Sequence, residues 1–325
     1  MTAHLKEEDN FENYLRKHPF TGIPESLYAP MNYIMQLGGK RMRPKLLIMA
    51  YESCGGQQKE DAYKLALAIE TFHNFSLVHD DIMDNAHLRR GQETVHEKWN
   101  TATAILAGDN LLTKCYDLIL NTNVANKETL LKLFTNTATQ VCEGQQLDMD
   151  LPNQSHVTEA EYLEMIKYKT AVLPAVALQM GALAANSSKE VAEAFYQYGL
   201  SLGMAFQLQD DYLDTFGTTE AIGKQVGGDI LENKKTVLYL HALNHLLGAS
   251  KQQLENWFTQ TAQDNTLKIE QVKALYQMAN SDTYLLNMKA EYEAKALEHL
   301  ANTGLNEVHK SIFIALFDLI KNRVN

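Results

Sequence analysis

The chain contains few of the residues that all-β proteins and disulfide-stabilised proteins need. Its 325 residues include 6 prolines, 17 glycines and three cysteines, Cys54, Cys115 and Cys142. All-β proteins place glycine and proline in many turns, so this composition argues against a β-sandwich or barrel. Three cysteines without close pairing do not make a disulfide framework, and they favour a reducing, cytoplasmic compartment.

Long hydrophobic runs and excess positive charge are also missing. The first 17 residues are polar and acidic, which predicts no secretory signal. The most apolar stretch, TAVLPAVALQMGALAA (170–185), is too short to span a membrane, so we expect a buried core helix. The net charge of −11 argues against a general nucleic-acid surface. It does not exclude a small anionic ligand, because the basic residues are clustered, at 40–45, at 89–90 and at 224–235.

Helical periodicity dominates what is present. Apolar residues recur at three- and four-residue intervals in 61–81, 193–214 and 306–323. Ser155 or Thr158 is expected to cap the helix that follows, and Glu161 stands three residues after Thr158. There is no G-x-G-x-x-G motif, and GTTEAIGKQ (217–225) is one residue too long for a P-loop. We find no convincing alternating strand, and we predict a single all-α domain over residues 1–325.

The stretch SLVHDDIMDNAHLRRG (76–91) concentrates negative charge at the end of an apolar helix. Asp80, Asp81 and Asp84 share one side of that helix, because positions three and four apart are neighbours on it. A solvated helix face is the commonest explanation of such an acidic run. Buried carboxylates, however, need cations as partners, and all-oxygen ligands suit Mg²⁺. The segment therefore indicates a candidate magnesium site.

The same spacing returns in DDYLD (210–214), again at the end of an apolar helical run. Two identical triads far apart in the sequence suggest two helices that face each other across a cavity. Six carboxylates in one place would repel one another strongly without cations. Asp210, Asp211 and Asp214 therefore strengthen the prediction of bound metal ions and add that of a polyanionic ligand.

Together these motifs resemble the trans-isoprenyl diphosphate synthases of the polyprenyl synthetase family, which includes farnesyl and geranylgeranyl diphosphate synthases. The matching segments, in family order, are GGKRMRP (38–44), FHNFSLVHDDIMDNAHLRRG (72–91), AGD (107–109), GQQLD (144–148), KT (169–170), FQLQDDYLD (206–214) and GKQVGGDILENKKT (223–236). Two departures are Glu93, where the family commonly has proline, and a C-terminal tail, KNRVN, that is less basic than many. The resemblance implies an antiparallel helix bundle around a deep central cavity, a homodimer and three Mg²⁺ ions. It also implies the condensation of isopentenyl diphosphate with an allylic diphosphate.

The resemblance assigns roles to individual residues. Asp80, Asp84 and Asp210 are the expected magnesium ligands, supported by Asp81, Asp211 and Asp214. The residues expected at the allylic diphosphate are Arg89, Lys169, Lys224 and Lys234, with Thr170 and Gln207 at the reaction centre. The residues expected at isopentenyl diphosphate are Lys40, Arg43, His73 and Arg90. Each of these basic residues, taken alone, would more often be a solvated or ordinary core residue.

Product length is expected to depend on Phe75, five residues before the first aspartate, and on its small neighbour Ser76. By helix rise Phe75 lies about 7.5 Å below Asp80 and is bulky enough to form a floor. An aromatic residue there resembles short-chain enzymes that stop at C15 or C20, and Ser76 favours geranylgeranyl diphosphate over farnesyl diphosphate.

Three other functions compete with this prediction. A class I terpene cyclase shares the first triad and the helical fold but normally lacks the second triad. An HD-type metal phosphohydrolase would use the His79-Asp80 pair but leaves DDYLD unexplained. A regulatory subunit of a heteromeric prenyltransferase would tend to lose the triads, and both are intact here.

Overall fold

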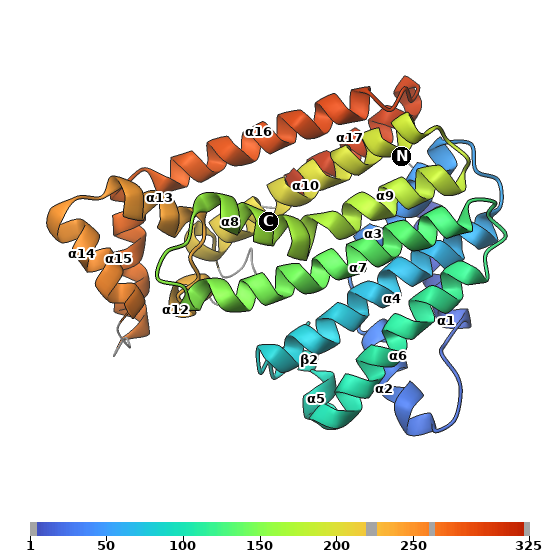
Figure 1. The fold of residues 1–325 in the computed structure, drawn as a ribbon, viewed down its shortest axis with the longest axis horizontal. Helices are drawn as coiled ribbons and strands as arrows, with labels where there is room; N and C mark the ends of the chain where they lie inside the picture. The colour runs from blue at the N-terminus through green and yellow to red at the C-terminus, as the bar shows by residue number, and fades with distance from the viewer. Residues whose placement is uncertain (1–4, 219–225, 260–263, 322–325) are drawn as a thin grey trace. The chain divides into compact units, whose positions relative to one another are not determined.

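The computed structural model describes residues 5–218, 226–259 and 264–321, and it is built almost entirely of helices (Figure 1). These residues form two compact units. One contains residues 1–138 and 176–196, and the other contains residues 139–175 and 197–325. The all-α class is confirmed. The single-domain assignment stays a prediction.

The first unit is built around the long helix α4 (Lys59–Met83), which packs along α6 (Thr101–Leu120) and α3 (Met42–Ser53) (Figure 1). Residues 65–72 of α4 are all buried, as expected for a helix that is apolar on every side. The unit also contains α1 (Leu5–Lys17), α2 (Glu25–Gln36), α5 (Val95–Lys98), and parts of α7 (Lys127–Asp150), α9 (Val172–Ala184) and α10 (Lys189–Phe216).

A two-stranded hairpin follows α4 and was not predicted. Strand β1 (Leu88–Arg89) pairs antiparallel with β2 (Gln92–Glu93). The two loop residues, Arg90 and Gly91, have φ of 54° and 75°, which is the left-handed conformation of a type I′ turn. Strands of two residues are too short to show an alternating pattern, so they could not be predicted from the sequence.

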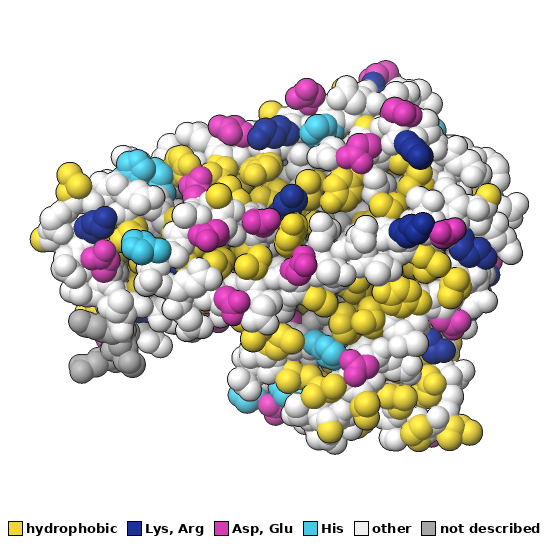
Figure 2. Space-filling model, viewed as in Figure 1, with side chains coloured by type: hydrophobic (Ala, Val, Ile, Leu, Met, Phe, Trp, Pro, Cys, Tyr) yellow, Lys and Arg dark blue, Asp and Glu magenta, His cyan; other side chains and the backbone are white. Residues whose placement is uncertain are grey.

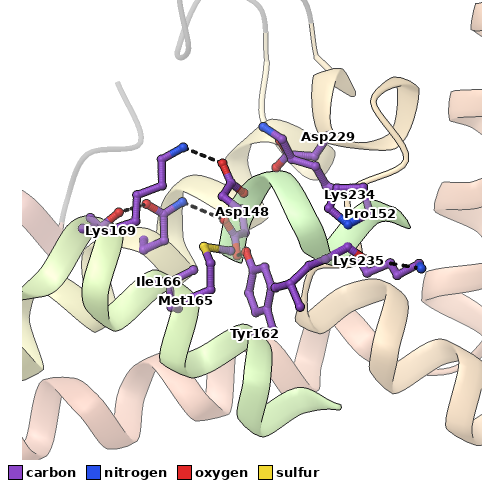
Figure 3. Close-up of a pocket in the computed structure, with 13 residues that line it drawn as sticks. Asp148, Pro152, Tyr162, Met165, Ile166, Lys169, Asp229, Lys234 and Lys235 are labelled. Carbon is purple, nitrogen blue, oxygen red and sulfur yellow. Dashed lines mark hydrogen bonds and ion pairs between the residues drawn. The ribbon is translucent and has the colours of Figure 1, made fainter. Parts of the chain in front are cut away.

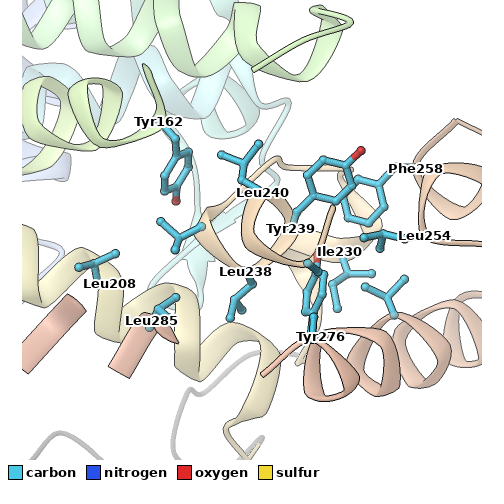
Figure 4. Packing of buried hydrophobic residues seen from close by; sticks show 14 of the residues in the cluster. Tyr162, Leu208, Ile230, Leu238, Tyr239, Leu240, Leu254, Phe258, Tyr276 and Leu285 are labelled. Carbon is cyan, nitrogen blue, oxygen red and sulfur yellow. The ribbon is translucent and has the colours of Figure 1, made fainter. Parts of the chain in front are cut away.

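The second unit holds the remaining helices. It comprises η1 (Leu151–Asn153), α8 (Glu159–Ile166), the π-helix η2 (Lys167–Ala171), α12 (Gly228–Leu231), α13 (Val237–His245), α14 (Gly248–Thr259), α15 (Asn265–Met278), α16 (Ser281–Ala301), α17 (Glu307–Lys321), and the other parts of α7, α9 and α10. Its buried core gathers around α13, where the ring of Tyr239 lies 4.2 Å from that of Phe258 (Figure 4). Of the two predicted caps, Thr158 is the one that caps α8, in a reciprocal capping box with Glu161.

The apolar stretch 170–185 forms the end of η2 and the helix α9, and most of its residues are buried, as expected. Within the described parts of the chain, no helix is both long and apolar enough to cross a membrane. On the face shown in Figure 2, acidic and basic side chains are interspersed among hydrophobic ones.

Candidate active site

The first aspartate triad lies at the C-terminal end of α4, where the sequence placed it. Asp81 is completely buried, and Nε of Arg89 donates to its two carboxylate oxygens at 2.7 and 2.9 Å. The same guanidinium reaches Asp80, with 3.8 Å between Nη2 and Oδ2. Burial raises the pKa of the Asp81 carboxyl, and the hydrogen bonds from Arg89 oppose that rise. Asp81 thus fixes Arg89 beside the triad, while Asp80 is half-buried and Asp84, which ends the helix, is exposed.

Four residues assigned to isopentenyl diphosphate also lie in the first unit, and two of them touch. Nη1 of Arg43 lies 3.2 Å from Nε2 of His73. Because a guanidinium can only donate, Nε2 must accept, so the ring is the neutral tautomer protonated at Nδ1. Burial, and then the charge of Arg43, lowers the pKa of His73 well below its ordinary value. Arg90, on the hairpin turn, donates to the carbonyl of Gly38, and Lys40 is exposed on the same loop.

Phe75 belongs to a row of aromatic rings below the triad. Its ring centroid lies 4.8 Å from that of His79 and 5.4 Å from that of Phe72, and Phe72 packs edge-on against Phe134 of α7 at 5.3 Å. Ser76 is half-buried and donates to the carbonyl of His73. The row would need to open for a longer chain to pass, which agrees with the role of Phe75 as a floor. That role stays a prediction.

The second triad lies on α10 in the second unit. Asp211 is buried and accepts two hydrogen bonds, from the hydroxyl of Tyr162 at 2.6 Å and from Nε2 of Gln207 at 2.9 Å. Thr170 in turn donates to Oε1 of Gln207 at 3.0 Å, so both residues expected at the reaction centre are linked to the triad. Burial, and then the charge of Asp229, raises the pKa of Asp211. A cation placed nearby would reverse that rise, as expected for a metal-binding carboxylate.

A pocket in the second unit brings several of the predicted residues together (Figure 3). Lys169 reaches Asp148, with 2.5 Å between Nζ and Oδ2. Lys234 contacts Asp229, with 3.3 Å between Nζ and Oδ1. The residues that line the pocket are Asp148, Leu151, Pro152, Tyr162, Met165, Ile166, Lys169, Thr170, Gln207, Asp211, Asp229, Lys234 and Lys235. Lysine and aspartate side chains thus line one pocket, which an anionic group with bound metal ions could enter.

Lys169 and Thr170 lie on the π-helix η2. Two glycines, one on each neighbouring helix, allow those helices to approach η2 closely. A Cβ on Gly144 of α7 would lie 2.7 Å from the carbonyl carbon of Tyr168 and 2.8 Å from Cα of Lys169. A Cβ on Gly203 of α10 would lie 2.6 Å from Cα of Ala171. All three distances are shorter than real Cβ contacts, so only glycine fits at either position. Single-turn π-helices are frequent at functional sites, and this one presents the Lys-Thr pair.

Several pocket residues were not predicted as site residues. Asp148 and Asp229 lie within the recognised segments GQQLD and GKQVGGDILENKKT, and that position is the signal that could have identified them. Tyr162 lies in no recognised segment, so the sequence held no signal for it. The backbone NH of Asp229 donates to Oδ2 of Asp214 at 2.9 Å, which ties that segment to the second triad. Lys224 and residues 322–325 of the C-terminal tail lie outside the described residues.

The donor chemistry of both triads fits magnesium. All six candidate ligands are carboxylates, the oxygen donors that Mg²⁺ prefers. Among the described residues, no three His, Cys, Asp or Glu side chains already form a group ready to hold a metal. The triads belong to different units, and their joint use of metal ions stays a prediction.

Comparison with known proteins identifies the family of the chain. Residues 24–278 match the family model described as polyprenyl synthetase. A geranylgeranyl diphosphate synthase from Methanosarcina mazei is 44% identical over 221 residues, which cover 67% of this chain and 68% of that protein. A geranylfarnesyl diphosphate synthase from Natronomonas pharaonis is 42% identical over 236 residues, covering 67% and 69%. A crystal structure of a geranylgeranyl pyrophosphate synthase superimposes with a TM-score of 0.94 at 41% identity and covers both chains completely.

Proposed function

The chain belongs to the polyprenyl synthetase family, and we propose that it condenses isopentenyl diphosphate with an allylic diphosphate to give geranylgeranyl diphosphate. It is a prenyltransferase, and its relatives named above make C20 and C25 prenyl diphosphates. Farnesyl diphosphate is the alternative end product. The observation that carries the proposal is the family match together with two intact triads, each beside the basic residues that a diphosphate needs.

The reaction joins the allylic chain to the five-carbon isopentenyl unit, and the diphosphate of the allylic substrate is released. The carbon–oxygen bond of the allylic diphosphate breaks and leaves an allylic carbocation. The double bond of isopentenyl diphosphate attacks this cation, a new carbon–carbon bond forms, and a proton is lost. The chain therefore has to hold two diphosphates, stabilise the negative charge on the leaving one, and keep water away from the cation.

The allylic diphosphate is assigned to Arg89, Lys169, Lys224 and Lys234. Lys169 and Lys234 are held by Asp148 and Asp229, so each cation is in position before the substrate arrives. Thr170 and Gln207 form a polar pair at 3.0 Å and would line the reaction centre. Preorganised donors of this kind need little rearrangement when charge develops on the leaving group.

Isopentenyl diphosphate is assigned to Lys40, Arg43, His73 and Arg90. A diphosphate bound there would stabilise the protonated form of His73, which the protein alone disfavours. The buried ring of Phe75 and its aromatic neighbours would shield the growing chain from water.

Magnesium is the cofactor that the family implies, and we infer three ions per active site. Asp80, Asp84 and Asp210 would hold them, with Asp81, Asp211 and Asp214 in support. When bound, Mg²⁺ neutralises the charge that accumulates on the departing diphosphate.

We also propose a cytoplasmic homodimer. The three cysteines are free, as expected in a reducing compartment. Helix α6 exposes the hydrophobic side chains of Ile105, Leu106 and Leu120 by 43%, 60% and 52%, and we propose that a second copy of the chain covers them. Light scattering behind a sizing column tests the dimer, and a monomer at micromolar concentration would contradict it.

One assay tests the reaction. The purified protein is incubated with Mg²⁺, isopentenyl diphosphate and, in separate reactions, dimethylallyl, geranyl or farnesyl diphosphate, and products are measured by mass spectrometry. A C20 diphosphate supports the proposal, and a C15 end product supports the alternative. Free phosphate alone would indicate a hydrolase, cyclised hydrocarbon a cyclase, and no product a regulatory subunit. Each of these three outcomes overturns the proposal.

A further inference from the structure

Arg41 is a buried arginine in an unusual backbone conformation next to the isopentenyl diphosphate residues. It is 5% exposed, and its φ of 48° is in the left-handed region that residues other than glycine rarely adopt. It stands at the N-cap of α3 but its side chain caps nothing, whereas that position normally favours Ser, Thr, Asp or Asn. Neither the backbone nor the capping position therefore explains an arginine here.

The guanidinium of Arg41 is bound on three sides. Nη1 lies 2.6 Å from Oε1 of Glu70 on α4, Nε lies 3.0 Å from Oε1 of Glu12 on α1, and Nη2 donates to the carbonyl of Met35 on α2 at 2.6 Å. Glu70 is 2% exposed, and Asn74 donates to the same Oε1 at 3.3 Å. Three helices thus converge on one side chain at the start of a fourth.

The contact between Arg41 and Glu70 resembles the contact of Arg43, which is assigned to isopentenyl diphosphate. Glu70 and His73 are one turn apart on α4, and they contact Arg41 and Arg43, which are two residues apart at the start of α3. The preceding loop has a further contact, because Arg90 donates to the carbonyl of Gly38. The buried pair and Arg90 together fix the segment that carries Lys40 and Arg43.

We propose that Arg41 and Glu70 are positioning residues for isopentenyl diphosphate. Their buried ion pair sets the start of α3 against α4 and so holds Arg43 at His73, without touching the substrate itself. A buried ion pair is weak evidence for stability, because an apolar pair of similar volume often stabilises as well or better. What the charged pair provides is a defined geometry. The inference rests on the proposed function.

The test is Glu70→Gln, which keeps the shape of the side chain and removes its charge. We expect the KM for isopentenyl diphosphate to rise about tenfold or more, because small displacements of a positioning group weaken substrate binding strongly. The KM for the allylic substrate and kcat should change less than about twofold. Glu70→Asp keeps the charge but shortens the side chain, and it should raise the KM for isopentenyl diphosphate by a smaller factor. Arg41→Lys keeps the positive charge but lacks the planar guanidinium, and it should also raise only the KM for isopentenyl diphosphate.

Asp61→Asn is the matched control. Asp61 is a carboxylate on the same helix, 4% exposed, and Oδ1 accepts from the backbone NH of Asn123 at 3.0 Å. This variant should lower the thermal midpoint while leaving both KM values unchanged. Binding of a non-reactive thio analogue of isopentenyl diphosphate, measured by calorimetry with circular dichroism on the same samples, separates affinity from folding.

The outcomes separate the inference from the proposed function. A wild-type protein that makes no prenyl diphosphate overturns the function itself. If the wild type is active and folded Glu70→Asp and Arg41→Lys bind the analogue as tightly as wild type, the positioning role is wrong. It is also wrong if Asp61→Asn raises the KM for isopentenyl diphosphate as much as the Glu70 variants do, since the effect would then be general destabilisation.

Discussion

Gly144→Ala adds a single methyl group that would meet the backbone of the π-helix η2. The new Cβ would lie 2.7 Å from the carbonyl carbon of Tyr168 and 2.8 Å from Cα of Lys169, with the backbone nitrogen of Lys169 closer still. All three are backbone atoms, so no side chain can rotate away. Helix α7 and the π-helix η2 would have to separate by roughly 1 Å to reach an ordinary contact distance.

The effect on stability should be modest. Alanine is favoured over glycine inside a helix by about 1 kcal/mol, and overpacking of a core typically costs about 1–3 kcal/mol. The net loss is therefore at most about 2 kcal/mol, which corresponds to a few degrees in Tm for a chain of this length. Activity should suffer more, because a displacement of roughly 1 Å in a positioning element can lower the rate about a hundredfold.

The measurement is kcat with saturating isopentenyl and farnesyl diphosphates, alongside Tm by circular dichroism. We expect kcat to fall about a hundredfold in a protein that remains folded at the assay temperature. Cys142→Ala is the control, because Cys142 is exposed on the same helix two residues earlier. A Cβ on Gly203 would approach η2 from α10, so Gly203→Ala should have a similar effect. A folded Gly144→Ala protein with kcat within twofold of wild type would refute the claim that close packing of α7 positions Lys169.

Three further predictions concern individual residues. Asp80→Ala should lower kcat by at least about a hundredfold, because that is the order of rate lost when a group that stabilises transition-state charge is removed. The circular dichroism spectrum should not change. Near-normal turnover would contradict the assignment of Asp80. Phe75→Ser removes a ring from the aromatic row and should lengthen the product by one or more isoprene units in mass spectra, whereas an unchanged product would place the floor elsewhere. Because burial and Arg43 lower the pKa of His73, the unfolded chain takes up a proton that the folded chain does not as the pH falls below about 6.5. In urea titrations, the free energy of unfolding should therefore fall less between pH 7.5 and 5.5 for the His73→Gln protein than for wild type. Equal falls would show that His73 is not buried as a neutral ring.

The sequence alone determined the class of the fold and the position of each aspartate triad within its helix. Helical periodicity depends only on which residues are apolar, so it identified α4, α10 and α17 with nearly their observed bounds. The capping of α8 by Thr158 was also local, since the two partners are three residues apart. The recognised motifs then named the candidate residues, because a motif is itself a pattern of neighbours along the chain.

Contacts between distant segments were decided by tertiary structure alone. The pairing of Lys169 with Asp148 spans 21 residues, and that of Tyr162 with Asp211 spans 49, so no local pattern contains them. The same is true of Arg41, which in the sequence is one basic residue among several and in the structure is the buried partner of Glu70. Whether a charge is solvated or buried depends on which helices pack around it, and that packing is a property of the whole chain.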